Sequence, residues 1–93
     1  MTLLLTQQAQ ADLERSIDYY EHQRAGLGVR FRNRVKNALS YLQENPLLYP
    51  SINGVIRRQV LLDFPYSIYY YIDEENKVVL VLSIAHQYRK PPY

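Results

Sequence analysis

Apolar residues recur at intervals of three and four in two stretches of the first half of the chain. One stretch runs from Gln7 to Arg24, with Thr6 as a candidate N-cap, and its apolar stripe consists of Ala9, Leu13, Ile17 and Tyr20. The other ends at Asn45-Pro46, and its stripe consists of Phe31, Val35, Ala38, Leu39 and Leu42. Both patterns predict amphipathic helices, and the glycine-containing turn over residues 25–28 predicts that they form an antiparallel hairpin.

The other regular segments are strand-like. The N-terminal residues 1–6 form a short apolar run, and three further runs cover residues 55–62, 66–73 and 77–85. Residues 66–73 are aromatic and β-branched, and residues 77–85 are almost entirely aliphatic, as expected of a buried central strand. We therefore predict an α+β fold with the order β-α-α-β-β-β, in which the helical hairpin packs on one face of a small, mostly antiparallel sheet.

Alternation along the strands sorts their side chains between the two faces of the sheet. Over residues 66–73, the predicted core set is Tyr66, Ile68, Tyr70 and Ile72, and the predicted open-face set is Ser67, Tyr69, Tyr71 and Asp73. Arg57 and Arg58 are adjacent and therefore point to opposite faces. We expect one of them to pair with an acid, the candidates being Asp12, Asp63 and Asp73, and the other to be solvated or to face a partner. An open face with tyrosines and an arginine predicts a binding surface.

Composition limits the picture further. Ninety-three residues suffice for one small core, so residues 1–93 are expected to form a single domain. The absence of cysteine excludes disulfides, thiolate metal sites and cysteine nucleophiles. His22 and His86 lie on separate predicted elements without metal-ligand spacing, so neither a metal nor a cofactor is expected. No apolar run is long enough to span a membrane and the N-terminus lacks a basic signal region, so we expect a cytoplasmic protein.

The net charge of +2 is small but unevenly distributed. Residues 12–21 contain four acids and one arginine, whereas residues 27–45 contain four bases and one acid. Two basic pairs follow, at residues 57–58 and 89–90. The chain can therefore present a positive face, which permits a nucleic-acid partner but is also common on ordinary solvated surfaces.

The candidate chemistry lies near the C-terminus, where His86, Tyr88 and Arg89 follow the last aliphatic run. A histidine can act as general acid or base near neutral pH, and a tyrosine can stack on a base or donate a proton. Arg57, Arg58 or Arg89 could hold a phosphate. These are the groups that RNA cleavage by its own 2′-hydroxyl requires. The same histidine could instead be a capping or surface residue.

Several short motifs occur in order along almost the whole chain. They are Leu5-Thr6 with Ala9, Asp12 and Leu13, then Phe31 with residues 39–42 and Pro46, then Arg57 or Arg58, then Phe64-Pro65-Tyr66-Ser67-Ile68-Tyr69-Tyr70, and finally residues 79–86 with Arg89 and Pro91. In this order and at this length, the chain resembles the RelE/ParE superfamily, the small toxins of type II toxin–antitoxin systems. The resemblance implies a growth inhibitor that serves plasmid stabilisation and is silenced by a cognate antitoxin, encoded by a neighbouring gene, in a hetero-oligomer.

The resemblance leaves two activities open. RelE-like members cut mRNA in the ribosomal A site, which would make His86, Tyr88, Arg57, Arg58 and Arg89 the catalytic residues. ParE-like members inhibit DNA gyrase instead, and His86 would then be a structural or interface residue. A chain that only binds its partner and is no longer toxic is a third alternative.

We favour the ParE-like branch. Residues 46–56 carry no charge, where ribosome-dependent nucleases tend to have lysines or a carboxylate. Residues 64–70 and the spacing of His86, Arg89 and Pro91 also look more like the ParE-like branch. The residues expected to bind a partner are Arg57, Tyr69, Tyr71, Tyr88, Arg89, Lys90 and Tyr93.

Overall fold

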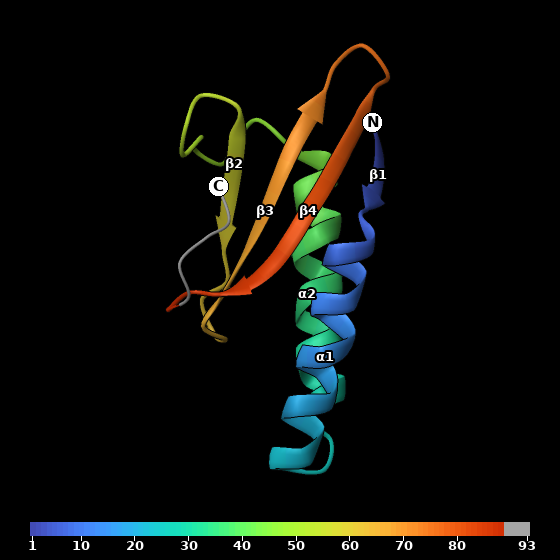
Figure 1. Ribbon diagram of the computed structural model, residues 1–93, viewed down its shortest axis with the longest axis vertical. Helices are drawn as coiled ribbons and strands as arrows, with labels where there is room; N and C mark the ends of the chain where they lie inside the picture. Colours follow the sequence, from blue (N-terminus) through green and yellow to red (C-terminus); the bar gives the residue numbers. More distant parts are fainter. Residues whose placement is uncertain (89–93) are drawn as a thin grey trace.

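The computed structural model describes residues 1–88, and its helices and strands follow the predicted order (Figure 1). They are β1 (Thr2–Leu5), α1 (Gln7–Gln23), α2 (Leu27–Glu44), β2 (Ile56–Val60), β3 (Tyr66–Asp73) and β4 (Val78–His86). The strands form one sheet in the order β1-β4-β3-β2, with β1 parallel to β4 and the other neighbours antiparallel. The α1–α2 hairpin covers one face of this sheet (Figure 1), which confirms the predicted α+β fold.

The element boundaries differ from the predicted ones by one or a few residues. β3 has the predicted bounds, whereas β2 is shorter at both ends and β4 extends to His86. α2 begins at Leu27, so Gly28 is a helical residue rather than part of the turn. The chain reverses at Gly26, whose φ of 88° lies in the left-handed region that glycine adopts without strain. No helix within residues 1–88 is long and apolar enough to cross a membrane.

Aromatic side chains from both layers form the centre of the core. Phe31 of α2 is fully buried, and its ring centroid lies 4.9 Å from that of Tyr20 on α1. The same ring lies 5.1 Å from Phe64 and 5.0 Å from Tyr66, both in edge-to-face contact. Such ring pairs add to the free energy gained by burying apolar area. Phe31 therefore joins the helical hairpin to the sheet.

β1 pairs with only the first part of β4. Beyond the end of β1, side chains at the start of α1 form hydrogen bonds with the backbone of β4. The parallel pairing stops at Leu5. The hydroxyl of Thr6, the N-cap of α1, donates to the Leu82 carbonyl at 2.9 Å. Further along the helix, Asp12 Oδ2 accepts the N–H of Ile84 at 3.0 Å. These two side chains fix α1 against the edge of β4.

A bulge in β4 changes which of its side chains face the helices. The pairing with β3 shifts between Tyr69 and Tyr70, which leaves Leu82 as an extra residue in β4. Residues beyond the bulge exchange faces, so Ile84 and His86 lie on the face that the helices cover. Ile84 is accordingly a core residue, with an exposed fraction of 2%.

The two helices are in close contact at Gly28. A Cβ atom at this position would lie 2.7 Å from the Ile17 carbonyl oxygen and 2.9 Å from the Glu21 Cβ. The Glu21 carboxylate accepts the N–H groups of Gly26 and Gly28, each at 3.0 Å. It thereby caps the N-terminus of α2, whose own N-cap residue has no side chain.

Tyr70 joins β3 to the loop that follows α2. Its side chain is fully buried, and its hydroxyl donates to the Pro46 carbonyl at 2.5 Å. Burial raises the pKa of Tyr70 to about 12, against a smaller opposing effect of the Arg57 guanidinium. The hydroxyl therefore stays protonated at physiological pH and holds the start of the loop against the sheet.

We expect Gly28→Ala to lower the free energy of unfolding by about 1–3 kcal/mol, because the new methyl group would overlap α1. Helix propensity alone would raise it by about 1 kcal/mol, so the sign of the change separates the two effects. Ser40→Ala, at an exposed position of α2, is the matched control and should change stability by less than about 0.5 kcal/mol. Urea unfolding measures all three proteins, and an unchanged or raised stability of Gly28→Ala would contradict the close contact.

Tyr70→Phe should lower the free energy of unfolding by about 1 kcal/mol at neutral pH, because the bond to Pro46 is lost. The folded-state pKa of Tyr70 lies above the ordinary 10.0, so the wild-type contribution is complete below pH 10 and is lost as the pH rises toward about 12. The variant lacks this titration. Urea unfolding over this alkaline range should show the gap between the two proteins closing and then reversing, and a constant gap would refute the assignment.

Candidate functional site

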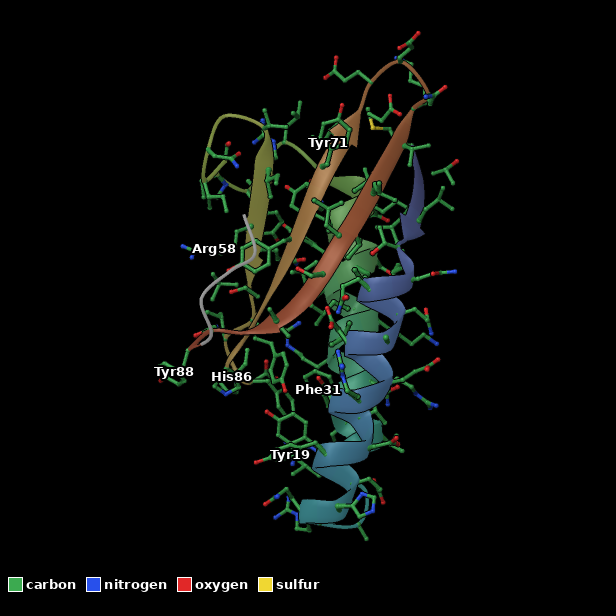
Figure 2. The ribbon with its side chains drawn as sticks, viewed as in Figure 1. Tyr19, Phe31, Arg58, Tyr71, His86 and Tyr88 are labelled. Atoms are coloured by element: carbon green, nitrogen blue, oxygen red, sulfur yellow. The ribbon has the colours of Figure 1, made fainter. Side chains whose placement is uncertain are left out.

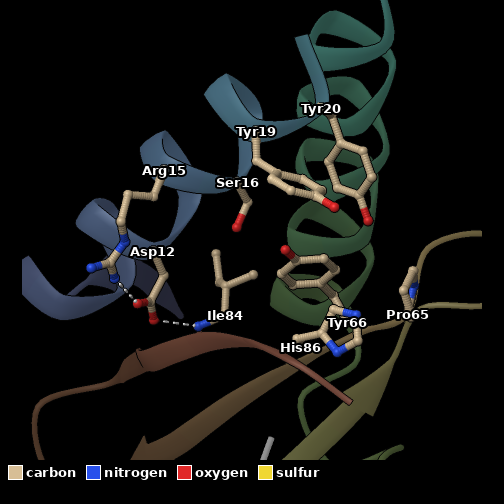
Figure 3. A pocket seen from close by; sticks show the side chains of 9 residues that line it. All are labelled: Asp12, Arg15, Ser16, Tyr19, Tyr20, Pro65, Tyr66, Ile84 and His86. Carbon is tan, nitrogen blue, oxygen red and sulfur yellow. Dashed lines mark hydrogen bonds and ion pairs between the residues drawn. The ribbon is translucent and has the colours of Figure 1, made fainter. Parts of the chain in front are cut away.

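A groove of about 690 Å³ lies between α1 and the ends of β3 and β4 (Figure 3). Helix α1 lines it with Asp12, Arg15, Ser16, Tyr19 and Tyr20, and the other side is lined by Pro65, Tyr66, Ile84 and His86. We call it the α1–β4 groove. It arises because side chains of α1 bond β4 only as far as Ile84, and the end of β4 then curves away from the helix (Figure 1).

Aromatic rings form a continuous wall along the α1–β4 groove. The ring centroid of Tyr20 lies 5.4 Å from that of Tyr19 and 6.0 Å from that of Tyr66. Tyr66 lies 5.3 Å from His86, which lies 5.2 Å from Tyr88. Burial, together with the nearby Tyr66 and Tyr19, raises the pKa of Tyr20. The wall is therefore uncharged around Tyr20 at neutral pH and offers flat apolar surface with hydroxyl groups at its rim.

The charged groups of the α1–β4 groove neutralise each other. Asp12 Oδ1 accepts from Arg15 Nη2 at 2.9 Å and from Gln8 Nε2 at 2.7 Å, while Oδ2 accepts from Ile84. Both carboxylate oxygens are thus engaged, which disfavours a role for Asp12 as a general base. The pair leaves the groove without a net charge from these two side chains.

His86 and Tyr88 come together at the end of β4, as the sequence predicts. The Tyr88 backbone N–H donates to His86 Nδ1 at 3.2 Å, so the neutral imidazole carries its proton on Nε2. Tyr88 is 86% exposed, whereas His86 is half-buried in the groove. Figure 2 shows both at the lower end of the sheet, with Tyr19 of α1 below them in this view.

Arg57 turns toward the loop before β2 and donates from Nη1 to the Tyr49 carbonyl at 2.7 Å. The prediction that Arg57 or Arg58 forms a salt bridge with an acid is wrong: within residues 1–88, neither arginine does so. The acids have other partners: Asp63 pairs with Arg34 at 2.7 Å, Asp12 with Arg15, and Asp73 with the side-chain amide of Asn76. A sequence cannot show this, because the choice among several bases depends on which helix lies beside each acid.

Arg58 lies far from the histidine that it was predicted to assist. It is exposed and pairs with Tyr69 across the strands, on the opposite face of the sheet from His86 (Figure 2). The predicted catalytic set is therefore divided among three places. His86 and Tyr88 share one end of the molecule, while Arg57 and Arg58 occupy two other positions, and Arg89 lies outside the described residues.

The residues predicted to bind a partner differ in their exposure. Tyr71 is 38% exposed on the sheet face opposite the helices, but Tyr69 is only 4% exposed and Ser67 only 2%. The expectation that these last two are open to solvent is therefore wrong. Lys90 and Tyr93 lie outside the described residues, as does Arg89.

A second surface lies in the loop over residues 46–55, which we call the apolar loop. It exposes Leu47, Leu48, Ile52 and Val55 and contains no charged residue. Its turn is well ordered, because the Asn53 side chain accepts the N–H groups of residues 55 and 56 and the Ser51 hydroxyl accepts that of Gly54. These bonds fix the backbone beside Ile52 and Val55, two of the exposed apolar residues.

The sequence does not identify the residues that line the α1–β4 groove. The groove depends on Tyr19, which lies off the apolar stripe of α1 and is 58% exposed. The available signal was the presence of a large aromatic residue, Tyr19, beside the apolar stripe and next to Tyr20. The sequence shows that the apolar loop lacks charge, but it does not distinguish the outward-facing leucines of this loop from core residues.

Comparisons with known proteins identify a family and a fold. The model of the family described as "ParE toxin of type II toxin-antitoxin system, parDE" matches residues 3–91. No curated protein sequence matches the chain. Similar solved structures include a chain of the chromosomal ParDE system of P. aeruginosa, with 21% identity, a TM-score of 0.69, and coverage of 92% of this chain and 95% of that one.

Two E. coli structures are similar in fold. A chain of the intact RelBE toxin–antitoxin complex has 20% identity and a TM-score of 0.73, over 95% of this chain and 98% of that one. The isolated RelE toxin has 20% identity and a TM-score of 0.72, over 96% and 86%. These likenesses establish the fold, whereas the family model establishes descent. Because that model spans nearly the whole chain, the protein belongs to the ParE toxin family of type II toxin–antitoxin systems.

Proposed function

We propose that this toxin stops growth by inhibiting DNA gyrase, and that a cognate antitoxin silences it in a hetero-oligomer. Membership of the ParE family supports this choice, since gyrase inhibition is the activity that the resemblance implies for ParE-like members. Gyrase and the ribosome both lie in the cytoplasm, so the proposal places the toxin there as well.

The observation that carries the proposal is the separation of His86 from the arginines of β2. A ribonuclease needs a general base, a general acid and a cationic clamp within reach of one phosphate. Arg57 is turned to the Tyr49 carbonyl, and Arg58 lies on the opposite sheet face. Among residues 1–88, the cation that lines the groove with His86 is Arg15, which is already paired with an aspartate. This arrangement favours a target other than RNA.

The apolar loop supports a protein target. Binding to a nucleic-acid backbone depends on lysine and arginine that neutralise phosphates, and this loop has neither. Exposed apolar side chains such as Leu47 and Leu48 are typical of surfaces that contact another protein. We propose that the apolar loop takes part in the contact with gyrase.

Two observations support an antitoxin partner. The solved structures with this fold include a ParDE system and an intact RelBE toxin–antitoxin complex. The chain also exposes large apolar side chains, among them Tyr19 and Leu62, at 58% and 92%. A small protein that functions as one component of a complex has reason to keep such side chains uncovered until its partner binds.

We expect the purified, antitoxin-free toxin to inhibit supercoiling by gyrase and to leave mRNA intact on translating ribosomes. Supercoiling of relaxed plasmid and primer extension on translated message measure the two activities side by side. Codon-positioned cuts with unaffected gyrase would overturn the proposal in favour of a ribosome-dependent endonuclease. If the toxin showed neither effect but could still bind its antitoxin, it would be a remnant that only binds its partner.

His86→Ala separates the same alternatives within one chain. If the toxin acts on gyrase, the variant should inhibit supercoiling as well as the wild type does, because no proton transfer is involved. If the toxin is a nuclease, loss of its general base should slow cleavage by about 10²-fold or more while the fold survives. Thermal melting of the variant is the control for folding.

A further inference from the structure

A second cavity, of about 340 Å³, lies where β3 extends past the start of β2. The pairing between these strands ends at Ile56 and Tyr71, and β3 continues to Asp73 while the chain before β2 turns away into the apolar loop. Figure 2 shows Tyr71 at the other end of the sheet from His86, and the cavity shares no residue with the α1–β4 groove. We call it the β2–β3 hollow. It is lined by Leu47, Gly54, Val55, Arg57, Tyr71, Ile72 and Glu74.

Most of the wall of the β2–β3 hollow is apolar. Leu47, Val55 and Tyr71 line it and are themselves exposed. The Asn53 side chain accepts the N–H groups of residues 55 and 56, so the backbone on the loop side of the hollow is fixed by hydrogen bonds. Exposed apolar side chains around a hollow gain free energy when a partner covers them. The hollow therefore continues the surface of the apolar loop.

Arg57 brings a positive charge into this apolar wall. The residue is half-buried, and its Nη1 donates to the Tyr49 carbonyl. Among residues 1–88, this is the one hydrogen bond that its side chain makes, and no acid pairs with it. A guanidinium has five N–H donors in a planar fork that matches a carboxylate. Because Arg57 lines the β2–β3 hollow, an anion that enters the hollow can reach its remaining donors.

The acids beside the β2–β3 hollow restrict the kind of anion that fits. Glu74 lines the hollow but forms no ion pair with Arg57, and residues 73–75 are three acids in succession. A nucleic-acid backbone brings a row of phosphates, which these acids would repel. A single carboxylate between apolar side chains meets the Arg57 guanidinium and the apolar wall together. The hollow therefore fits a protein partner better than a nucleic acid.

We propose that the β2–β3 hollow receives an acidic side chain of gyrase, whose carboxylate pairs with Arg57. The apolar residues that flank this acid in gyrase then pack on Leu47, Val55 and Tyr71. The charge of Arg57 gives the contact its specificity, and the apolar wall, which excludes water, strengthens the ion pair. This inference rests on the proposed action on gyrase and assigns that contact a place and a chemistry on the toxin.

The first test compares two neighbouring arginines. Arg57 lines the hollow, whereas Arg58 is exposed on the opposite face of the strand. Binding of each toxin variant to purified gyrase holoenzyme is measured by calorimetry. We expect Arg57→Gln to weaken binding at least about tenfold, because the gyrase carboxylate loses its counter-charge. Arg58→Gln should leave binding unchanged, and thermal melting shows whether both variants are folded.

The second test looks for a gain in affinity, which a folding defect would not produce. Glu74 lies at the hollow and repels an incoming carboxylate, so Glu74→Gln should strengthen gyrase binding about two- to fivefold. Glu75→Gln is the matched control, since Glu75 is the next residue and does not line the hollow. Its effect should be smaller. Weaker binding of Glu74→Gln would indicate a cationic group of gyrase in the hollow and would overturn the proposal.

The remaining outcomes separate this inference from the proposed function. Gyrase binding that is equally strong in both arginine variants would overturn the hollow assignment and leave gyrase as the target. An equal loss in both variants that disappears when gyrase carries no DNA would indicate contact with DNA and would also overturn it. If Arg57→Gln does not fold, the comparison of Glu74→Gln with Glu75→Gln decides alone. Failure of the wild-type toxin to bind gyrase at all would refute both proposals.

Discussion

The short pairing between β1 and β4 is the constraint on which the remaining architecture depends. β1 ends at Leu5, so α1 begins beside the middle of β4 rather than beyond its end. Thr6 and Asp12 then bond the backbone of the strand in place of a longer β1. These bonds set the position of α1 on the sheet, and Phe31 completes the attachment of the hairpin from α2. Where they stop, helix and strand separate and the α1–β4 groove opens.

The bulge at Leu82 determines which residues the groove contains. Because it reverses the alternation of β4, it places His86 on the helical face beside Tyr66. Arg58 remains on the other face, opposite Tyr69. One extra residue in a strand thus separates two side chains that appear to belong together in the sequence. The separation weakens the case for acid–base chemistry on RNA and leaves aromatic and apolar surfaces as the prominent features of the molecule.

The sequence predicted the elements well, because their patterns are local. The stripes of the two helices, the bounds of β3 and the order of the elements could be found from periodicity alone. The bulge could not, since nothing in the run of aliphatic residues in β4 distinguishes Leu82 from its neighbours. The burial of Tyr69 could not be found from the alternation along β3, and the partner of Asp63 depends on how α2 packs. These are properties of the assembled fold. For this reason the structure confirms the predicted fold but not the predicted grouping of the site residues.

Inhibition of gyrase is measured most directly in cells that express the toxin without its antitoxin. The superhelical density of a reporter plasmid and the 5′ ends of cellular mRNA are determined from the same culture as growth stops. We predict that the plasmid loses negative supercoils while no new 5′ ends appear in register with codons. Codon-positioned ends on a background of unchanged plasmid topology would contradict gyrase as the target.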